Sequence, residues 1–185
     1  MIIETIEYRG YNINVYSDES PESPREWDNL GTMVCFHNRY NLGDKHNMDI
    51  EELKELAQRK CVIALPLYLY DHSGLTMRTT PFSCPWDSGQ VGYIYVTKEK
   101  VLKEFNRKRV NKPLRQRVEA LLKCEIETYD LYLTGQVYGF STETPQGDCL
   151  DSCYGFYGDD EQRNMIEEAK KGIDSYIAQL SSNPM

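Results

Sequence analysis

A cysteine, two of the three histidines and an aspartate are the side chains of this sequence best suited to catalysis. Cys84 lies in the stretch TTPFSCPWDSGQVGYIYV (residues 79–96), and it could act as a nucleophile if a nearby imidazole accepted its proton. His72 or His37 could be that base, with Asp87 as the group that orients it. The sequence spacing does not place a histidine beside Cys84, so a small cysteine- and histidine-dependent enzyme is an alternative hypothesis.

The other interpretation of residues 79–96 is structural. Phe82, Cys84 and Trp86 would fill the core below a loop that prolines and a glycine shape. Alternatively, the loop would present Trp86 or Asp87 to a partner. On this interpretation the stretch connects and braces two strands and carries out no chemistry.

Metal and phosphate sites have no clear motif in this sequence. His37, Asp44, His46, His72 and the six cysteines lack the short paired spacing that is typical of zinc sites. The segment DSGQVG has two glycines but neither of the usual phosphate-binding patterns. We expect no metal and no cofactor.

A basic segment is the strongest electrostatic feature of the chain. Residues 98–123 carry 10 basic and 3 acidic side chains. The residues expected to contact the phosphates of a nucleic acid are Arg107, Lys108, Arg109 and Lys112. The alternative is a solvated helix surface, partly neutralised by two i,i+4 pairs, Arg115–Glu119 and Lys123–Glu127.

The two ends of the chain are acidic, and the net charge of the whole is −8. Residues 1–60 and 124–185 each carry 12 acidic side chains, which favour binding to a basic protein. The acidic and aromatic residues expected to contact such a partner are Asp18, Glu19, Glu22, Glu26, Trp27, Asp28, Trp86, Asp87, Asp159, Asp160 and Glu161.

The elements that must position these residues can be predicted from periodicity and capping. Alternating apolar residues predict hairpins over 5–16 and 137–158, and strands over 32–37, 61–70 and 91–96. Pro66 places the strand 61–70 at a sheet edge or at a bulge. Helices are predicted over about 49–60, 98–105, 111–134 and 159–180.

Strands that come in hairpins predict an α+β fold: a mixed, mainly antiparallel β-sheet with about four helices packed on it. With 185 residues and no long linker, we expect a single globular domain over 1–185. The scattered cysteines and the lack of a long apolar run favour a cytoplasmic protein that neither enters nor crosses a membrane.

Four blocks of the sequence carry a resemblance. YDHSGLTMRTT, FSCPWDSGQVGYIYV, ETYDLYLTGQVYGF and DSCYGFYGDD resemble small acidic proteins of phages, plasmids and conjugative elements of Firmicutes. The resemblance spans roughly residues 30–160. That group is similar to anti-defence proteins, including inhibitors of the Cas nuclease of type II CRISPR systems. It implies no catalytic residue.

The charge distribution and the resemblance lead to one main hypothesis. We expect a non-enzymatic inhibitor of a host defence nuclease, which binds a type II Cas nuclease with its guide RNA and blocks DNA binding or cleavage. The basic segment 98–123 would add a contact to nucleic acid. Besides the enzyme hypothesis, the remaining alternative is a nucleic-acid-binding accessory protein of a mobile element.

Overall fold

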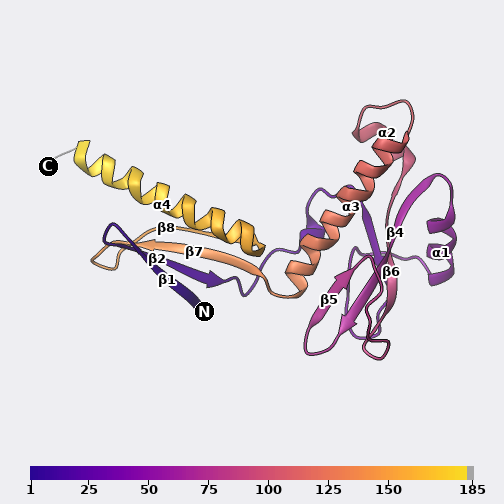
Figure 1. Cartoon of the computed structure of the whole chain (residues 1–185), viewed down its shortest axis with the longest axis horizontal. Coiled ribbons are helices and arrows are strands. Elements are labelled where there is room, and N and C mark those ends of the chain that lie inside the picture. Colours follow the sequence, from indigo (N-terminus) through magenta and orange to yellow (C-terminus); the bar gives the residue numbers. More distant parts are fainter. Residues whose placement is uncertain (183–185) are drawn as a thin grey trace. The chain divides into compact units, whose positions relative to one another are not determined.

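The computed structural model describes residues 1–182, which form two compact units. Unit 1 contains residues 1–22 and the chain from Gly135 onward, whereas unit 2 contains residues 23–134. Unit 2 is therefore one continuous segment inserted between the two parts of unit 1. Each unit has its own four-stranded antiparallel sheet and its own hydrophobic core (Figure 1).

The sheet of unit 1 has the order β1-β2-β7-β8. Its strands are β1 (Ile2–Tyr8), β2 (Tyr11–Ser17), β7 (Val137–Glu143) and β8 (Cys149–Tyr157). The first hairpin turns at Arg9 and Gly10, whose φ angles of 53° and 83° are those of a tight hairpin turn. The central pairing joins the two ends of the sequence, because Ser17 of β2 lies opposite Tyr138 of β7.

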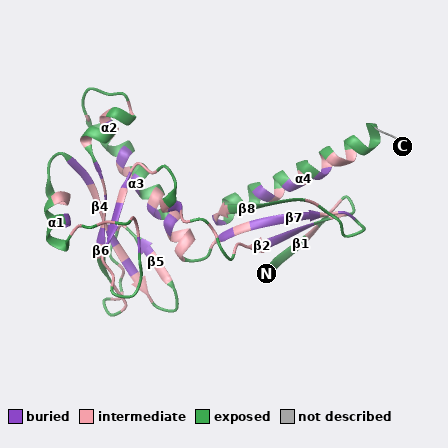
Figure 2. Cartoon of the chain, turned by 180° about the vertical axis from the view of Figure 1, so that it is seen from behind, coloured by how far each residue is buried: buried purple, intermediate pink, exposed green. Residues whose placement is uncertain are grey.

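One long helix, α4 (Gly158–Ser182), covers a face of the unit 1 sheet (Figure 1). Met165, Ala169 and Ile173 form a stripe at helical spacing and are buried against Ile13 and Phe140 of the strands. Figure 2 shows the buried residues of this unit on the inner strands and on one side of α4. Ile166 and Ile177 of α4 are partly buried beside this stripe, and Leu180 is 55% exposed.

The sheet of unit 2 has the order β3-β6-β4-β5. Its strands are β3 (Thr32–Cys35), β4 (Val62–Asp71), β5 (Leu75–Arg78) and β6 (Ser88–Thr97). Gly92 of β6 lies so close to β3 that a Cβ atom at this position would be 1.9 Å from the carbonyl oxygen of Val34. Only glycine fits between these two strands.

Three helices and a short 3-10 turn complete unit 2. They are η1 (Pro24–Glu26), α1 (Ile50–Gln58), α2 (Lys98–Glu104) and α3 (Lys112–Leu133). The buried side chains of α3 are Val118, Leu122, Ile126 and Tyr129, at a spacing of three and four residues. Figures 1 and 2 show α3 and α1 on opposite sides of the β4–β6 pair.

The predicted α+β class is confirmed, as are the two hairpins and the four helices. The strands form two sheets, however, where the sequence suggested one. The expectation of a single globular domain over 1–185 stays a prediction beside the two compact units. Pro66 lies where β4 has only β6 beside it among the described strands, and a bulge follows between Leu67 and Tyr68, as its missing amide hydrogen requires.

Candidate nucleic-acid-binding pocket

The connector between α2 and α3 in unit 2 carries most of the basic residues singled out above. Helix α2 begins at the cap Thr97, whose hydroxyl accepts a hydrogen bond from the Lys100 amide, and it ends at Phe105. Asn106 turns the chain with a φ of 48°. Helix α3 then begins after Asn111, whose side-chain oxygen accepts a hydrogen bond from the Leu114 amide at 3.1 Å. Both helix ends are thus fixed by capping, which holds the intervening loop between them.

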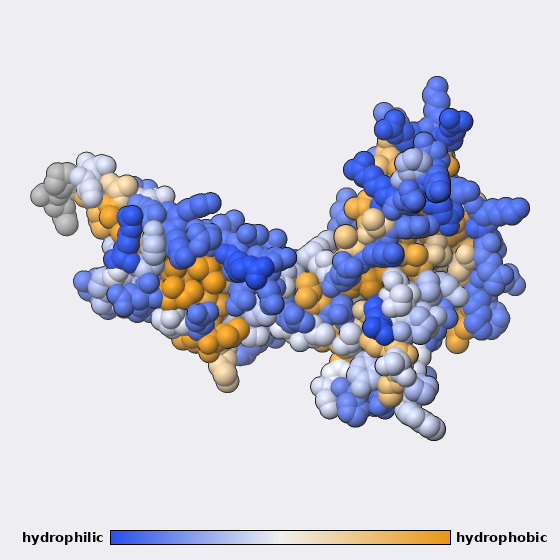
Figure 3. Space-filling view, viewed as in Figure 1, coloured by the Kyte–Doolittle hydropathy of each residue, from blue (hydrophilic) through white to orange (hydrophobic). Residues whose placement is uncertain are grey.

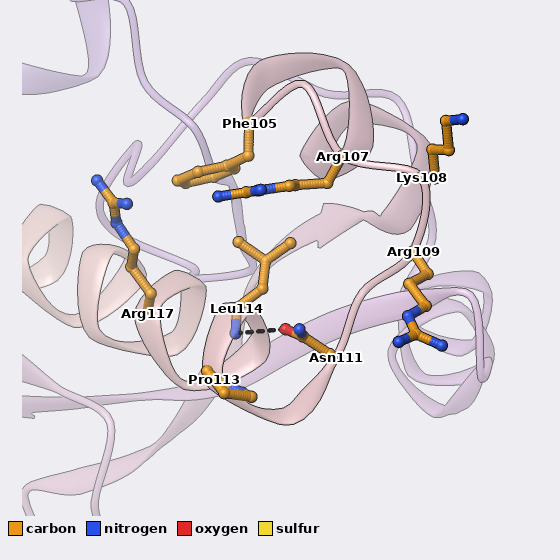
Figure 4. Close-up of a pocket in the computed structure, with 8 residues that line it drawn as sticks. All are labelled: Phe105, Arg107, Lys108, Arg109, Asn111, Pro113, Leu114 and Arg117. Atoms are coloured by element: carbon orange, nitrogen blue, oxygen red, sulfur yellow. Dashed lines mark hydrogen bonds between the residues drawn. The ribbon is translucent and has the colours of Figure 1, made fainter.

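This connector forms a pocket with a volume of about 480 Å³ (Figure 4). Its lining consists of Phe105, Arg107, Lys108, Arg109, Asn111, Pro113, Leu114 and Arg117. Four of the eight lining residues are cations and none is a carboxylate. Within the described residues no acidic side chain forms an ion pair with any of these four. The cations are exposed, so their charge is available to a ligand.

The apolar side of the pocket is made by Phe105 and Leu114, which are half-buried and pack against the core of unit 2. The guanidinium carbon of Arg117 lies 5.1 Å from the centre of the Phe105 ring. Figure 4 shows the extended side chain of Arg107 beside the same ring, between Phe105 and Leu114, whereas Lys108 and Arg109 point away from it. The pocket therefore combines an aromatic wall with planar cations.

This arrangement suits a phosphate ligand. Guanidinium groups present paired N–H donors that match the oxygens of a phosphate, and stacking on an aromatic ring restricts their motion before the ligand arrives. Hydrophilic residues dominate the surface around α2 and the following loop in Figure 3. Of the possible neutralising pairs on α3, Arg115–Glu119 is present at 2.8 Å, and neither residue lines the pocket.

The structure thus gathers three of the four predicted nucleic-acid contacts, Arg107, Lys108 and Arg109, in one pocket. Lys112 is exposed but is not part of the lining. The sequence interpretation missed Phe105 and Arg117. The signal for Arg117 was available, because it follows Pro113 and Leu114 by four and three residues and so shares their face of the helix.

The acidic candidates of unit 1 lie at one end of its sheet. The Asp18 amide donates to the carbonyl oxygen of Val137 at 2.8 Å, and the Tyr157 hydroxyl donates to the carbonyl oxygen of Glu22. The loop that carries three of the predicted contacts therefore lies beside the end of β8, where α4 begins. Together, the acidic residues at this end are Asp18, Glu19, Glu22, Asp159, Asp160 and Glu161. Glu19 also pairs with the amino group of Met1 at 2.9 Å, which lowers the pKa of its carboxyl group.

The remaining acidic candidates belong to unit 2. Glu26, Trp27 and Asp28 are exposed and follow Arg25, which is anchored in the protein. The Arg25 side chain is only 4% exposed, and it binds Asp44 at 2.8 Å and Glu125 at 3.1 Å. Burial alone would lower the pKa of Arg25, but the hydrogen bonds and charges of the two carboxylates raise it. This buried ion network fixes the base of the loop, and the sequence interpretation did not identify it.

The residues first considered for catalysis do converge in unit 2. The Cys84 thiol donates to Asp87 Oδ2 at 3.7 Å, and the same oxygen lies 3.2 Å from Nδ1 of His72. In a cysteine–histidine pair the imidazole must accept the thiol proton, whereas here that proton is directed to the carboxylate. Trp86 beside them is 91% exposed, so it does not fill the core as one interpretation suggested. His37 instead stacks on Tyr40, with 5.1 Å between the two ring centres.

The charges separate between the two units. Unit 1 contains 14 acidic and 4 basic residues, a net charge of −10, whereas unit 2 contains 15 acidic and 17 basic residues, a net charge of +2. Residues 1–22 and the chain from Gly135 onward, which are the outer parts of the two acidic ends, thus fold into the same unit. Residues of the basic segment 98–123 line the pocket between α2 and α3 in unit 2.

Metal binding, membrane crossing and likeness to known proteins all bear on the function of these surfaces. Within residues 1–182, no group of three or more histidine, cysteine, aspartate or glutamate side chains is arranged to hold a metal ion. The helices of this same part of the chain are too short or too polar to cross a membrane. Comparison with protein-family models, with curated proteins and with solved structures returns no significant match.

Proposed function

We propose that this protein is a non-enzymatic inhibitor of a host defence nuclease, and that it binds a type II Cas nuclease carrying its guide RNA. The observation that carries the proposal is the charge separation: a pocket in unit 2 with four cations that form no ion pair within residues 1–182, and a net charge of −10 in unit 1. A nuclease–RNA complex offers one binding site to the acidic unit 1 and another to the basic pocket of unit 2. Its protein surface is basic where it holds nucleic acid, and its RNA exposes phosphates.

The mechanism follows from this complementarity. The acidic end of unit 1 would occupy basic protein surface that normally receives the backbone of DNA, and the field of a net charge of −10 would accelerate association. The basic pocket would contact the RNA or the target strand. Inhibition would then result from a blocked DNA channel or from a blocked conformational step before cleavage. Neither route requires a catalytic residue.

The direct test is inhibition of DNA cleavage by a purified type II Cas nuclease loaded with guide RNA. We expect inhibition to be complete near equal amounts of the two proteins, and to weaken as the salt concentration rises. Reversing three charges at the start of α4, with Asp159→Lys, Asp160→Lys and Glu161→Lys, should slow binding more than tenfold. Cleavage that continues at full rate in the presence of an excess of the protein contradicts the proposal.

A matched control separates surface contact from total charge. The triple variant Glu4→Lys, Glu7→Lys and Glu168→Lys changes three exposed residues of the same unit by the same total charge. It should inhibit nearly as well as the parent protein. If both triple variants lose inhibition equally, general charge and not the acidic end of unit 1 is responsible.

A second candidate function is a small enzyme that uses Cys84 and His72, because both side chains approach Asp87, although the thiol proton is directed to this carboxylate and not to the imidazole. Replacing both residues by alanine distinguishes the two functions, because neither side chain is needed for binding through charge. An inhibitor should keep its stoichiometric inhibition in the double variant. Loss of a measurable turnover in the same variant would instead support the enzyme.

A further inference from the structure

The basic pocket is more than a positively charged surface, because it has an apolar wall. Phe105 and Leu114 are half-buried and pack against the hydrophobic core of unit 2, and both also line the pocket. Four exposed cations surround them, and two of these, Arg107 and Arg117, lie beside the Phe105 ring (Figure 4). A ligand that fits this site must offer both a flat apolar surface and negative charge.

A nucleic-acid duplex does not meet this requirement. Its bases are stacked inside the helix, so it presents only phosphates and sugars to a shallow site. A single strand exposes the faces of its bases, which stack on aromatic rings and on guanidinium planes, while its phosphates bind nearby cations. The pocket volume of about 480 Å³ lies in the range of sites for small ligands, so it can receive one nucleotide but not a double helix.

We propose that this pocket binds single-stranded nucleic acid. The phosphate contacts the guanidinium groups of Arg107 and Arg117, and the attached base stacks on the layer formed by Phe105 and Arg107. Lys108 and Arg109 bind the neighbouring phosphates, since they point away from the ring. The inference rests on the proposed function in one respect: it names the form of nucleic acid that the pocket would meet in the nuclease complex.

The test uses the full protein with short labelled oligonucleotides and no nuclease. Fluorescence anisotropy should detect binding of a 12-nucleotide strand, whereas a hairpin duplex with the same number of phosphates should bind at least tenfold more weakly. RNA and DNA strands are compared in separate arms, which distinguishes the two sources of the single strand. A salt series gives the number of phosphates bound, because the slope of log K against log salt is about −0.7 per phosphate for single strands.

Two variants probe the two parts of the pocket. Phe105→Leu keeps an apolar side chain against the core but removes the stacking surface, and it should weaken binding about tenfold. Arg107→Ala with Arg117→Ala changes two exposed residues, so the fold is retained, and it should reduce the magnitude of the salt slope by about 0.7, because the two guanidinium groups bind one phosphate. The matched control, Lys45→Ala with Arg59→Ala, removes two exposed cations of unit 2 outside the pocket. It should change affinity less than twofold.

The inference is overturned if no strand binds, if the duplex binds as tightly as the single strand, or if the control variant loses as much affinity as the pocket variants. Thermal unfolding of every variant excludes loss of folding as the cause. The cleavage assay tests the proposed function separately. A protein that binds single strands through this pocket but inhibits no nuclease would support the binding of single strands and contradict the proposed inhibitor function.

Discussion

Replacing the buried Arg25 by methionine should destabilise unit 2 more than the loss of any one exposed charge of this unit. The guanidinium group is 4% exposed and makes hydrogen bonds to Asp44, to Glu125 and to the carbonyl oxygen of Gly31. Without it, two carboxylates would remain close together with no counter-ion. Removal of one partner from a buried ion network costs about 3–5 kcal/mol.

The structure places the expected value at the lower end of that range. Asp44 and Glu125 keep 24% and 14% exposure, so water can partly replace the lost arginine. Backbone amides also remain as donors, that of Met33 to Asp44 and those of Leu30 and Gly31 to Glu125. We therefore expect a loss of about 3 kcal/mol in the free energy of unfolding of this unit.

Urea denaturation followed by tryptophan fluorescence measures this loss, because both tryptophans, Trp27 and Trp86, belong to unit 2. The midpoint should fall by about 1–3 M urea. Lys54→Met breaks an exposed ion pair with Glu51 in the same unit and should shift the midpoint by far less.

A variant that neutralises the whole network gives the sharper result. Arg25→Met combined with Asp44→Asn and Glu125→Gln leaves no buried charge, and its amide oxygens can still accept the backbone hydrogen bonds. It should recover at least half of the stability lost by the single variant. If it is as unstable as Arg25→Met alone, the reasoning from unpaired charge is wrong and lost packing is the cause.

Three further results are expected. Gly92→Ala should lower the unfolding free energy by about 3 kcal/mol or more, because its Cβ would lie 1.9 Å from a carbonyl oxygen of β3, whereas Gly89→Ala on the same strand meets no atom within 4 Å and should cost little. Burial raises the pKa of the Cys35 thiol to about 12, so alkylation at pH 8 followed by mass spectrometry should label exposed Cys61 rapidly and Cys35 only after unfolding. Burial also raises the pKa of Asp130, despite the hydrogen bond from a backbone amide of β5, so this group favours folding below its unfolded pKa and loses that contribution as pH rises through its folded pKa. Asp130→Asn should therefore be relatively more stable than the parent at pH 7 than at pH 3.5, and an unchanged difference between the two pH values would contradict the assignment.

Local features of the sequence predicted local structure well. The pair Arg9–Gly10 specified a tight hairpin turn, and Asp49, Thr97 and Asn111 each cap the helix that follows them. These interactions join residues that are close in sequence, so residue type and spacing are enough to identify them. Strand β5 (Leu75–Arg78) was missed because only Leu75 and Met77 alternate with polar residues, whereas the equally short β3 contains the continuous apolar run Met33–Cys35.

The division into two sheets could not be predicted in this way. Strand β2 pairs with β7, although all of unit 2 lies between these two strands in the sequence. The alternation of apolar residues within a hairpin does not indicate which other hairpin it will pair with. The same limit applied to the candidate sites. The cations of the connector are neighbours in sequence and were found, whereas the approach of His72 and Cys84 to one carboxylate depends on how two separate loops fold.

The insertion of unit 2 into unit 1 sets an order of events on the ribosome. The hairpin of β1 and β2 is made before residues 23–134, but its partner β7 emerges only after them. At a synthesis rate of about 5–20 residues per second, this hairpin waits roughly 6–24 s with an unpaired edge and an uncovered apolar face. Unit 2 can complete its own sheet during that delay. The nascent chain thus carries a folded unit 2 while the β1–β2 hairpin still exposes its unpaired edge and its apolar face. The risk of aggregation is highest during this interval, and the chain then has the greatest need for a chaperone.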